Sequence, residues 1–377
     1  MFKNRIIVLV EGELTPFRIV HLQKILMLIK DFFSQIVVIY SGRSNLLQNS
    51  TKTQAINIKS LDLNSNSPLY SKLFHLFRSD FTRVKMLLKY SNNSDYVLFL
   101  GIYQPLSLFI TRLRGGYPIN FCGGFDVIYS SNRVISKIFS IVKWAAQMAM
   151  LTLTKKLIFE TPSVIYSFNL NKFRKKSFID GHLFVDLTYF FPAIPIEQRH
   201  YDIGFIGAFS EEKGVINFVS SIPYIVSHRQ VTIHIVGHGH LRNIIKEIIS
   251  MRGLSNVVHL QGPVKHFDLP KVLNNIKILV VPSFSEGLPN IVIEAMACGT
   301  VVLASSVGGI SDVLKDGQTG FLLRLNDPRH IAKRIIELLS KPELLEEVSK
   351  KAHEYVGENF SYDKALEAWQ KILNQLE

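Results

Sequence analysis

The sequence predicts an α/β fold made of two doubly wound domains, each with a parallel sheet and crossover helices. Three observations lead to this prediction. The chain has 377 residues, which exceeds one ordinary hydrophobic core and suggests about two domains. Short β-branched runs alternate with longer helical patterns in both halves, which is typical of parallel sheets whose strands are joined by helices. Hydrophobic residues make up 47% and charged residues 19% of the chain, which indicates a globular protein.

The first domain is expected over residues 1–195. Its first strand covers Arg5–Val10, and a helix follows at Phe17–Lys30. The apolar run that Glu11 ends is too short for the core of a signal peptide, so we interpret it as a buried strand. Further short β-branched runs predict strands at Gln35–Tyr40, Tyr96–Leu100, Ile119–Cys122 and Lys156–Glu160.

The longest apolar region, Ile138–Thr154, is expected to form a buried helix. Lys143 and Gln147 interrupt it. It also falls short of the ~20 clean apolar residues that a membrane-spanning helix needs, which is the alternative interpretation.

The second domain is expected over residues 196–361, after a linker at Phe191–His200 that holds two prolines and shows no periodicity. The tail Pro328–Leu376 has a helical pattern, and its last helix, at 362–377, is expected to pack back on the first domain. Two such domains facing one another would place a ligand cleft at the carboxyl ends of both sheets. Strands in this half are expected at Tyr201–Ile206, Val231–Val236, Val257–Gln261, Ile278–Val281, Val301–Ala304 and Gly320–Leu323.

Charge is distributed unevenly between the two halves. Residues 1–200 contain 25 Lys+Arg and 11 Asp+Glu, a net charge of +14, whereas residues 201–377 contain 18 and 19, a net charge of −1. A strongly basic half predicts an anionic partner. A solvated basic surface without a partner is the alternative.

Two loops of the second half follow strands and precede helices, which is where ligands bind in doubly wound sheets. In Ile206–Gly214, Gly207 permits close backbone approach and Lys213 supplies a positive charge near a helix N-terminus. That combination binds phosphate, although a capped surface turn would look the same. In Val236–Arg242, two glycines flank His238, a pattern that by itself indicates only a tight turn.

A third loop carries the most informative pattern in the chain. The stretch Val281–Leu323 places Glu286 in a Ser/Gly/Pro turn and Glu294 inside an amphipathic segment that ends at Gly299. Glu286 could accept hydrogen bonds from sugar hydroxyls, and Glu294 from a ribose diol. Each acid taken alone could also be an ordinary charged residue at or near a helix start.

The backbone between the two acids is expected to begin a helix. Pro289 fits the first helical position. The N–H groups of Gly287, Leu288 and Asn290 would then lack partners within the helix. With the helix dipole, they could hold the polar groups of a sugar or its phosphates.

These motifs, in this order, make the second half resemble the donor-binding domain of the retaining glycosyltransferases of family four, the glycosyl transferases group 1. The resemblance covers most of residues 201–323, and the first half matches only in outline. Its most specific part is PSFSEGLPNIVIEAMACGTVVLAS with the following GGISDVLKDGQTGFLL. The resemblance implies the GT-B architecture, in which two Rossmann-like domains face a central cleft.

The resemblance also implies a nucleotide-sugar donor, a UDP- or GDP-sugar, and a role for each matching residue. Lys213 would neutralise the diphosphate, Glu286 would contact the transferred sugar, and Glu294 would hold the ribose. The backbone at Val264 would contact the base. Many relatives carry an arginine where this chain has Ala208, so a second cation for the diphosphate must come from elsewhere.

Two positions in the first half are further candidates for the site. Gly12 follows the first strand and could approach the sugar or the diphosphate. Asp126, in the loop Asn120–Ile128, resembles a polar position near the donor sugar and joins Glu286 and Lys213 as a candidate catalytic residue; a helix N-cap is the alternative. We expect no metal, because the sequence has no D-x-D pair in a loop after a strand and no ligand cluster, and no cofactor.

Two basic segments suggest a location at a membrane. Ser67–Ser91 interleaves basic with large apolar residues, and Asn171–Lys176 is a second basic cluster. Such segments can lie on an anionic membrane surface, although a packed amphipathic helix is the alternative. The two cysteines, Cys122 and Cys298, form no disulfide framework, which favours the cytoplasm. A peripheral position at the inner face of the cell membrane fits these features.

The leading hypothesis is a metal-independent, retaining hexosyltransferase that extends a glycan or polyprenyl-linked glycan of the cell surface, such as lipopolysaccharide or capsule. One alternative is a nucleotide-sugar epimerase on the same fold, which would need no acceptor. Another is a non-enzymatic, basic nucleic-acid-binding protein. The basic residues are not interleaved with a recognised reader motif, so no nucleic-acid partner is expected.

Overall fold

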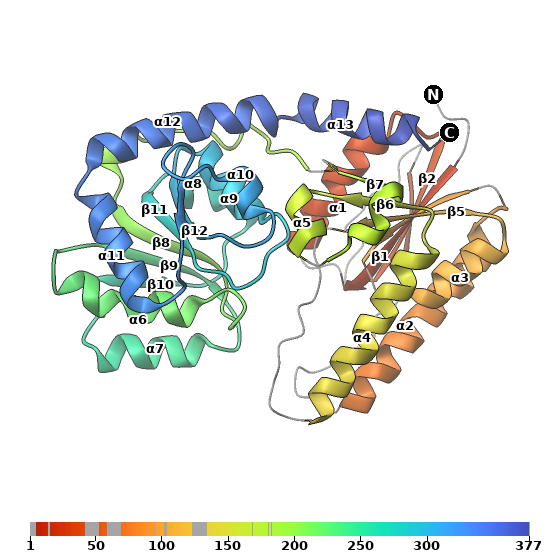
Figure 1. Cartoon of the computed structure of the whole chain (residues 1–377), viewed down its shortest axis with the longest axis horizontal. Coiled ribbons are helices and arrows are strands. Elements are labelled where there is room, and N and C mark those ends of the chain that lie inside the picture. The colour runs from red at the N-terminus through yellow and green to blue at the C-terminus, as the bar shows by residue number, and fades with distance from the viewer. Residues whose placement is uncertain are drawn as a thin grey trace. The chain divides into compact units, whose positions relative to one another are not determined.

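The chain folds into two compact units, each built around a parallel sheet (Figure 1). The computed structural model describes residues 5–13, 16–41, 53–58, 69–93, 95–101, 104–122, 134–167, 169–179, 181 and 183–376. Unit 1 comprises Met1–Glu160, Phe168–Gly181 and Leu366–Glu377, and unit 2 comprises Thr161–Ser167 and His182–Ala365.

Unit 1 is built on a seven-stranded sheet with the strand order β3-β2-β1-β4-β5-β6-β7. All neighbouring strands are parallel, and Val8 in the central strand pairs with Val38 on one side and Leu98 on the other. Five strands confirm the sequence prediction. The two at the sheet edges were missed, because one has three polar residues among its six and the other has only two residues. The strands are β1 (Arg5–Glu13), β2 (Gln35–Ser41), β3 (Thr53–Ile58), β4 (Tyr96–Leu100), β5 (Tyr117–Cys122), β6 (Lys156–Phe159) and β7 (Ser177–Phe178).

Helices cover this sheet, and three of them form one layer. Helix α3 packs against both α2 and α4, and Figure 1 shows the three helices beside the sheet. The last helix contributes Trp369, which is fully buried and stacks on Phe121 with ring centroids 5.8 Å apart. The chain from Leu366 onward thus belongs to unit 1. The helices are α1 (Pro16–Ile29), α2 (Leu69–Tyr90), α3 (Pro105–Leu113), α4 (Val134–Leu153) and α13 (Tyr362–Asn374).

Helix α4 differs from the expected buried helix. Ile141 is 60% exposed and Trp144 is 50% exposed, so one side of α4 faces solvent. In the part of the chain that the structure describes, no helix is both long and apolar enough to cross a bilayer.

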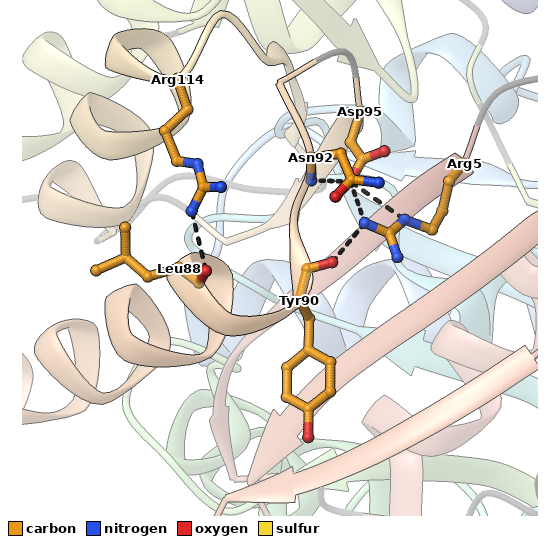
Figure 2. Close-up of polar contacts among 6 residues, drawn as sticks. All are labelled: Arg5, Leu88, Tyr90, Asn92, Asp95 and Arg114. Carbon is orange, nitrogen blue, oxygen red and sulfur yellow. Dashed lines mark hydrogen bonds and ion pairs between the residues drawn. The ribbon is translucent and has the colours of Figure 1, made fainter.

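A charged cluster ties the end of α2 to the sheet (Figure 2). The Arg5 guanidinium lies 2.7 Å from the Asp95 carboxylate and also donates to the carbonyl oxygen of Tyr90. Asp95 in addition accepts the N–H of Asn92 at 2.7 Å. The starts of β1 and β4 and the C-terminus of α2 are thereby joined by charge-assisted hydrogen bonds, which are the stronger kind.

Unit 2 is built on a six-stranded sheet with the order β10-β9-β8-β11-β12-β13. Alternate residues of β11 enter different apolar clusters: Ile278 and Val280 belong to one, and Leu279 and Val281 to the other. The sheet is therefore buried on both faces, as expected for a doubly wound domain. The strands are β8 (Tyr201–Ala208), β9 (Ile233–His238), β10 (Val258–Gln261), β11 (Ile276–Val281), β12 (Val301–Ser305) and β13 (Phe321–Leu323).

The strand order of unit 2 reverses between β8 and β11. The chain proceeds outward from β8 to β9 and β10, then returns to the other side of β8 at β11. In open α/β sheets, ligands bind beyond the carboxyl ends of the strands at such a reversal. The helices of unit 2 are α5 (Pro162–Ser167), α6 (Val215–Val226), α7 (Arg242–Met251), α8 (Leu269–Leu273), α9 (Asn290–Ala297), α10 (Ile310–Val313), α11 (Pro328–Leu339) and α12 (Pro342–Asn359).

The boundary between the units falls after Gly181, earlier than residue 195, and the segment expected as a linker is part of unit 2. Asn274 accepts the N–H groups of Ala193 and Ile194. Arg199 is 4% exposed. Its guanidinium donates to the carbonyl oxygens of Ile194, Ile276 and Cys298 and to the hydroxyl of Thr300. These buried hydrogen bonds fix the segment against β11 and α9. The sequence at 191–200 gives no signal of them.

One buried titratable group predicts how the stability of unit 1 depends on pH. Burial, followed by the positive charges of Lys24 and Arg18, lowers the pKa of His21 from 6.5 to about 4. The folded state therefore binds this proton more weakly than the unfolded chain does, so stability is retained above pH 6.5 and is lost as the pH falls towards 4. In urea unfolding followed by tryptophan fluorescence, His21→Gln should reduce this loss between pH 7 and pH 4. Parallel pH profiles for the two proteins would contradict the assignment.

Candidate functional site

Three loops meet by backbone contact at the carboxyl ends of the strands of unit 2. Gly214, at the end of the loop after β8, has φ +66°, and a Cβ there would lie 1.9 Å from the carbonyl oxygen of Pro282. Gly308, after β12, has φ +52°, and a Cβ there would lie 1.8 Å from the carbonyl oxygen of Glu286. Only glycine permits both the left-handed backbone and this approach. The loop after β11 is therefore held between its two neighbours.

Hydrogen bonds between backbone groups complete the loop contacts. The N–H of Phe284 donates to the carbonyl oxygen of Glu212 at 2.8 Å, and the N–H of Gly309 donates to that of Gly287 at 2.6 Å. Because main-chain atoms make these contacts, they fix the turn at 284–287 independently of its side chains. Its carboxylate, Glu286, is placed by the fold itself.

Glu286 and Lys213, predicted from separate motifs, are in direct contact. The Lys213 ammonium lies 2.7 and 2.8 Å from the two carboxylate oxygens of Glu286, and the Ser283 hydroxyl donates to one of them at 2.7 Å. The Glu286 side chain is 8% exposed and that of Lys213 is 30% exposed. The pair is thus a partly desolvated anion and cation that a polar ligand can reach from the Lys213 side.

The second acid lies on α9, which begins at Asn290. Pro289 is the N-cap residue and not the first helical residue, so the predicted start was wrong by one position. Glu294 lies about one turn inside the helix. Its side chain is 4% exposed, and one oxygen lies 2.7 Å from Nε2 of His266. The first N–H groups of α9, from Asn290 onward, point ahead of the helix, as the geometry of any helix start requires.

The other predicted residues of unit 2 lie at or after the ends of neighbouring strands. Gly207 is the second-last residue of β8 and pairs with Gly237 of β9, next to the exposed His238 that ends β9. Val264 and the buried Leu288 belong to the same apolar cluster. These residues line the strand ends next to the Lys213–Glu286 pair.

Three side chains at this edge were not predicted as site residues. Ser283 has a sequence signal, because a hydroxyl three residues before an acid is a common local partner. His266 and Arg242 have none, since their partners come from other loops. The Arg242 guanidinium donates to the carbonyl oxygen of Gly237 at 3.2 Å. It is the basic residue that this edge offers near the position of Ala208.

The two candidate residues in the first half, Gly12 and Asp126, have no described contact with the residues of this site. Gly12 lies in β1. Asp126 and most of its predicted loop lie outside the described residues. Within the described ranges, no group of three or more His, Cys, Asp or Glu side chains is arranged to hold a metal ion.

Comparison with known proteins shows which family this unit resembles. Residues 189–355 match the sequence model described as Glycosyl transferases group 1. The matched stretch lies within unit 2, so the sequence of this unit is similar to the glycosyl transferases group 1. The predicted resemblance of the second half to the glycosyl transferases group 1 is confirmed by this match and by relatives that are named glycosyltransferases.

Two relatives show the extent of the similarity. The uncharacterized glycosyltransferase MJ1178 of Methanocaldococcus jannaschii is 30% identical over 180 residues, which are 48% of this chain and 50% of that protein. The capsular polysaccharide biosynthesis glycosyltransferase CapM of Staphylococcus aureus is 28% identical over 181 residues, 46% of each. The chain spans about half the length of these curated relatives.

A solved structure extends the similarity to the fold of the whole chain. The structure of Anabaena Alr3699/HepE in complex with UDP and glucose has a TM-score of 0.75 and 15% identity, over 98% of this chain and 99% of that chain. The predicted GT-B fold, with two parallel-sheet α/β domains, is confirmed.

The backbone contact at Gly308 can be tested against a matched glycine. Gly308→Ala should destabilise unit 2 by roughly 1–3 kcal/mol more than Gly317→Ala, because overpacking adds to the strain of a left-handed alanine. Gly317 shares the positive φ, at +74°, but has open space around its Cβ position. Urea unfolding of the two variants measures the difference. Equal destabilisation would show that the contact with the Glu286 carbonyl is not constraining.

Proposed function

We propose that this protein is a retaining glycosyltransferase. It would move a hexosyl group from a nucleotide diphosphate sugar to a glycan or lipid-linked glycan in the synthesis of a cell-surface polysaccharide. The observation that carries the proposal is the Lys213–Glu286 pair. It lies at the strand reversal of a domain similar to the glycosyl transferases group 1, and Glu294 lies on the helix that follows the turn of Glu286.

The proposed donor is a UDP- or GDP-sugar. Support comes from the structurally similar HepE, which was solved with UDP and glucose. In this chain the Lys213 ammonium would pair with the diphosphate, and Glu286 would accept hydrogen bonds from the sugar hydroxyls. Glu294, oriented by His266, would hold the ribose, and the backbone at Val264 would contact the base.

The other predicted residues would complete the donor site. The N–H group of Asn290 at the start of α9, with those of Gly287 and Leu288 in the turn before it, would add to the positive potential at the diphosphate. Gly207 and His238 would line the phosphates, and Arg242 is our choice for the second cation in place of the family arginine. From unit 1, we propose Gly12 and Asp126 as donor-facing residues.

The chemistry follows from where charge develops. As the bond from the sugar to the diphosphate breaks, negative charge grows on the leaving phosphate and positive charge on the sugar ring. Lys213 and the α9 N-terminus would stabilise the negative charge on the phosphate, and Glu286 would stabilise the positive charge on the sugar ring. We propose that these groups act without a metal ion or another cofactor.

The proposed acceptor and location rest on other observations. Similarity to CapM, which is named for capsular polysaccharide biosynthesis, supports a surface glycan. The unpaired, buried cysteines Cys122 and Cys298 support a position in the cytoplasm.

The donor can be identified by thermal shift. The cognate nucleotide sugar should raise Tm by several degrees at 100 times its Kd, because a ligand that binds only the folded state stabilises it by about 2.7 kcal/mol at that concentration. A panel of UDP-, GDP- and CMP-sugars makes the measurement. A panel that leaves Tm unchanged throughout would contradict the donor site.

Two variants separate transfer from stability. Lys213→Ala and Glu286→Gln should each lower kcat by roughly 10²–10³, the loss seen when a group that stabilises developing charge is removed. Lys246→Ala, which alters an exposed lysine on α7, should retain full transfer. Wild-type rates in both site variants would refute the assignment, and product formation without an acceptor would indicate an epimerase.

The two acids should differ in what they bind. Glu294→Gln should weaken binding of UDP or GDP alone by about tenfold or more, since it removes a hydrogen bond to a charged group. Glu286→Gln should not weaken nucleoside diphosphate binding, because its proposed partner is the sugar. Calorimetric titration with the nucleoside diphosphate distinguishes them. Equal weakening by both substitutions would mean that the two roles are wrongly divided.

A further inference from the structure

Helix α3 buries two hydroxyl residues and exposes three large apolar residues. Ser107, Leu108 and Thr111 are buried. Leu106 is 39% exposed, Phe109 is 52% exposed and Leu113 is 66% exposed. These three share one side of the helix, at spacings of three and four residues. A helix on the surface of a globular domain normally shows the opposite arrangement.

The buried carboxylate of Asp80 on α2 explains this reversal. Asp80 is 2% exposed. It accepts the N–H groups of Leu106 and Ser107 and the Ser107 hydroxyl. A buried carboxylate without donors is costly, so α3 must turn its N-terminus and its polar side towards α2. Its apolar side is consequently left facing solvent.

The neighbouring helices also carry exposed apolar side chains. On α4, Ile141 and Trp144 are exposed, whereas the polar Gln147 is 3% exposed. On α2, Phe81 is 54% exposed. We name this surface the α3 face and define it by Phe81, Leu106, Phe109, Leu113, Ile141 and Trp144. Figure 1 shows the three helices that carry it in one layer.

The charges on these helices have one sign. Asp80 is the only acidic residue in the sequences of α2, α3 and α4, and it is buried. Exposed cations include Lys85 and Lys89 on α2 and Arg112 on α3. The Lys85 ammonium lies 5.1 Å from the centre of the Phe81 ring, so cation and apolar surface adjoin. This arrangement complements a surface with an apolar interior and anionic head groups.

We propose that the α3 face docks on an anionic lipid bilayer, with its apolar side chains at the level of the head groups and its lysines on the lipid phosphates. A second copy of the chain fits less well, because two α3 faces would bring cations of the same sign together. The proposal places the membrane contact on α3 and α4 as well as on the basic segment of α2. It stands independently of the proposed sugar transfer.

Vesicle binding tests the proposal directly. The full-length protein should sediment with vesicles of phosphatidylglycerol and phosphatidylethanolamine, less at high salt, and weakly with pure phosphatidylcholine. Phe109→Ser, Leu113→Ser and Trp144→Ser combined should lower binding at least tenfold. Lys85→Gln with Lys89→Gln should lower it about 25-fold, at about fivefold for each cation. Because all five side chains are exposed, the variants should keep the wild-type Tm.

A matched control uses apolar side chains of unit 2. Met251 is 76% exposed and Ile244 is 45% exposed, both on α7, and Met251→Ser with Ile244→Ser should leave vesicle binding unchanged. A serine variant of the α3 face that binds as well as wild type would overturn the proposal. So would a dimer that forms through this face while vesicles are ignored.

Tryptophan fluorescence gives a second readout. The chain has two tryptophans: Trp144 is 50% exposed, and Trp369 is fully buried. Vesicles should shift the emission to the blue and brominated lipids should quench it, and Trp144→Phe should abolish both effects while vesicle binding persists. Vesicle binding without any change in Trp144 emission would place the contact elsewhere.

Discussion

The geometry of the proposed donor site depends on the close approach of three backbones at the carboxyl edge of the second sheet. Gly214 and Gly308 allow the loops after β8 and β12 to touch the carbonyl oxygens of the loop between β11 and α9. Main-chain contacts of this kind leave the turn at 284–287 little freedom. The fold therefore holds the Glu286 carboxylate against Lys213. The ion pair is a consequence of this placement and not its main cause. A partly buried ion pair is weak evidence of stability, because the desolvation of the two charges offsets their attraction, which supports the view that the glycines set the geometry.

The same constraint explains which part of the site could be predicted from the sequence. Local sequence signatures exist for glycines next to strand ends, for an acid in a Ser/Gly/Pro turn and for a lysine before a helix. Lys213 and Glu286 are predicted from two separate stretches, and in the structure they are in contact. His266 has no such signature. Its contact with Glu294 joins the segment after β10 to the middle of α9, and no periodicity within either segment encodes it. Pro289 was misplaced by one residue because a proline fits both the N-cap and the first turn.

The fold shows a similar limit. Buried strands with apolar runs were found in both sheets, whereas β3 and β7 were missed at the sheet edges, where burial imposes less pattern. The segment 191–200 was expected as a linker because its prolines break periodicity. Its role in unit 2 rests on Asn274 and Arg199, whose hydrogen bonds run to backbone carbonyls far along the chain. A buried arginine that pairs with carbonyls instead of a carboxylate leaves no complementary charge in the sequence by which it could be recognised.

Buried polarity also links the charge asymmetry of the chain to its surfaces. In unit 2 the Lys213–Glu286 pair brings both signs together at one edge, in keeping with a half whose net charge is near zero. In unit 1 the layer of α2, α3 and α4 has a single acid, Asp80. Its carboxylate is buried and accepts hydrogen bonds from the N-terminus of α3. No acid of these helices is left to balance the cations outside, and the turn of α3 that satisfies Asp80 exposes Leu106, Phe109 and Leu113 beside them. The basic and apolar character of this surface is thus one consequence of a single buried carboxylate, and an anionic, partly apolar partner would satisfy both.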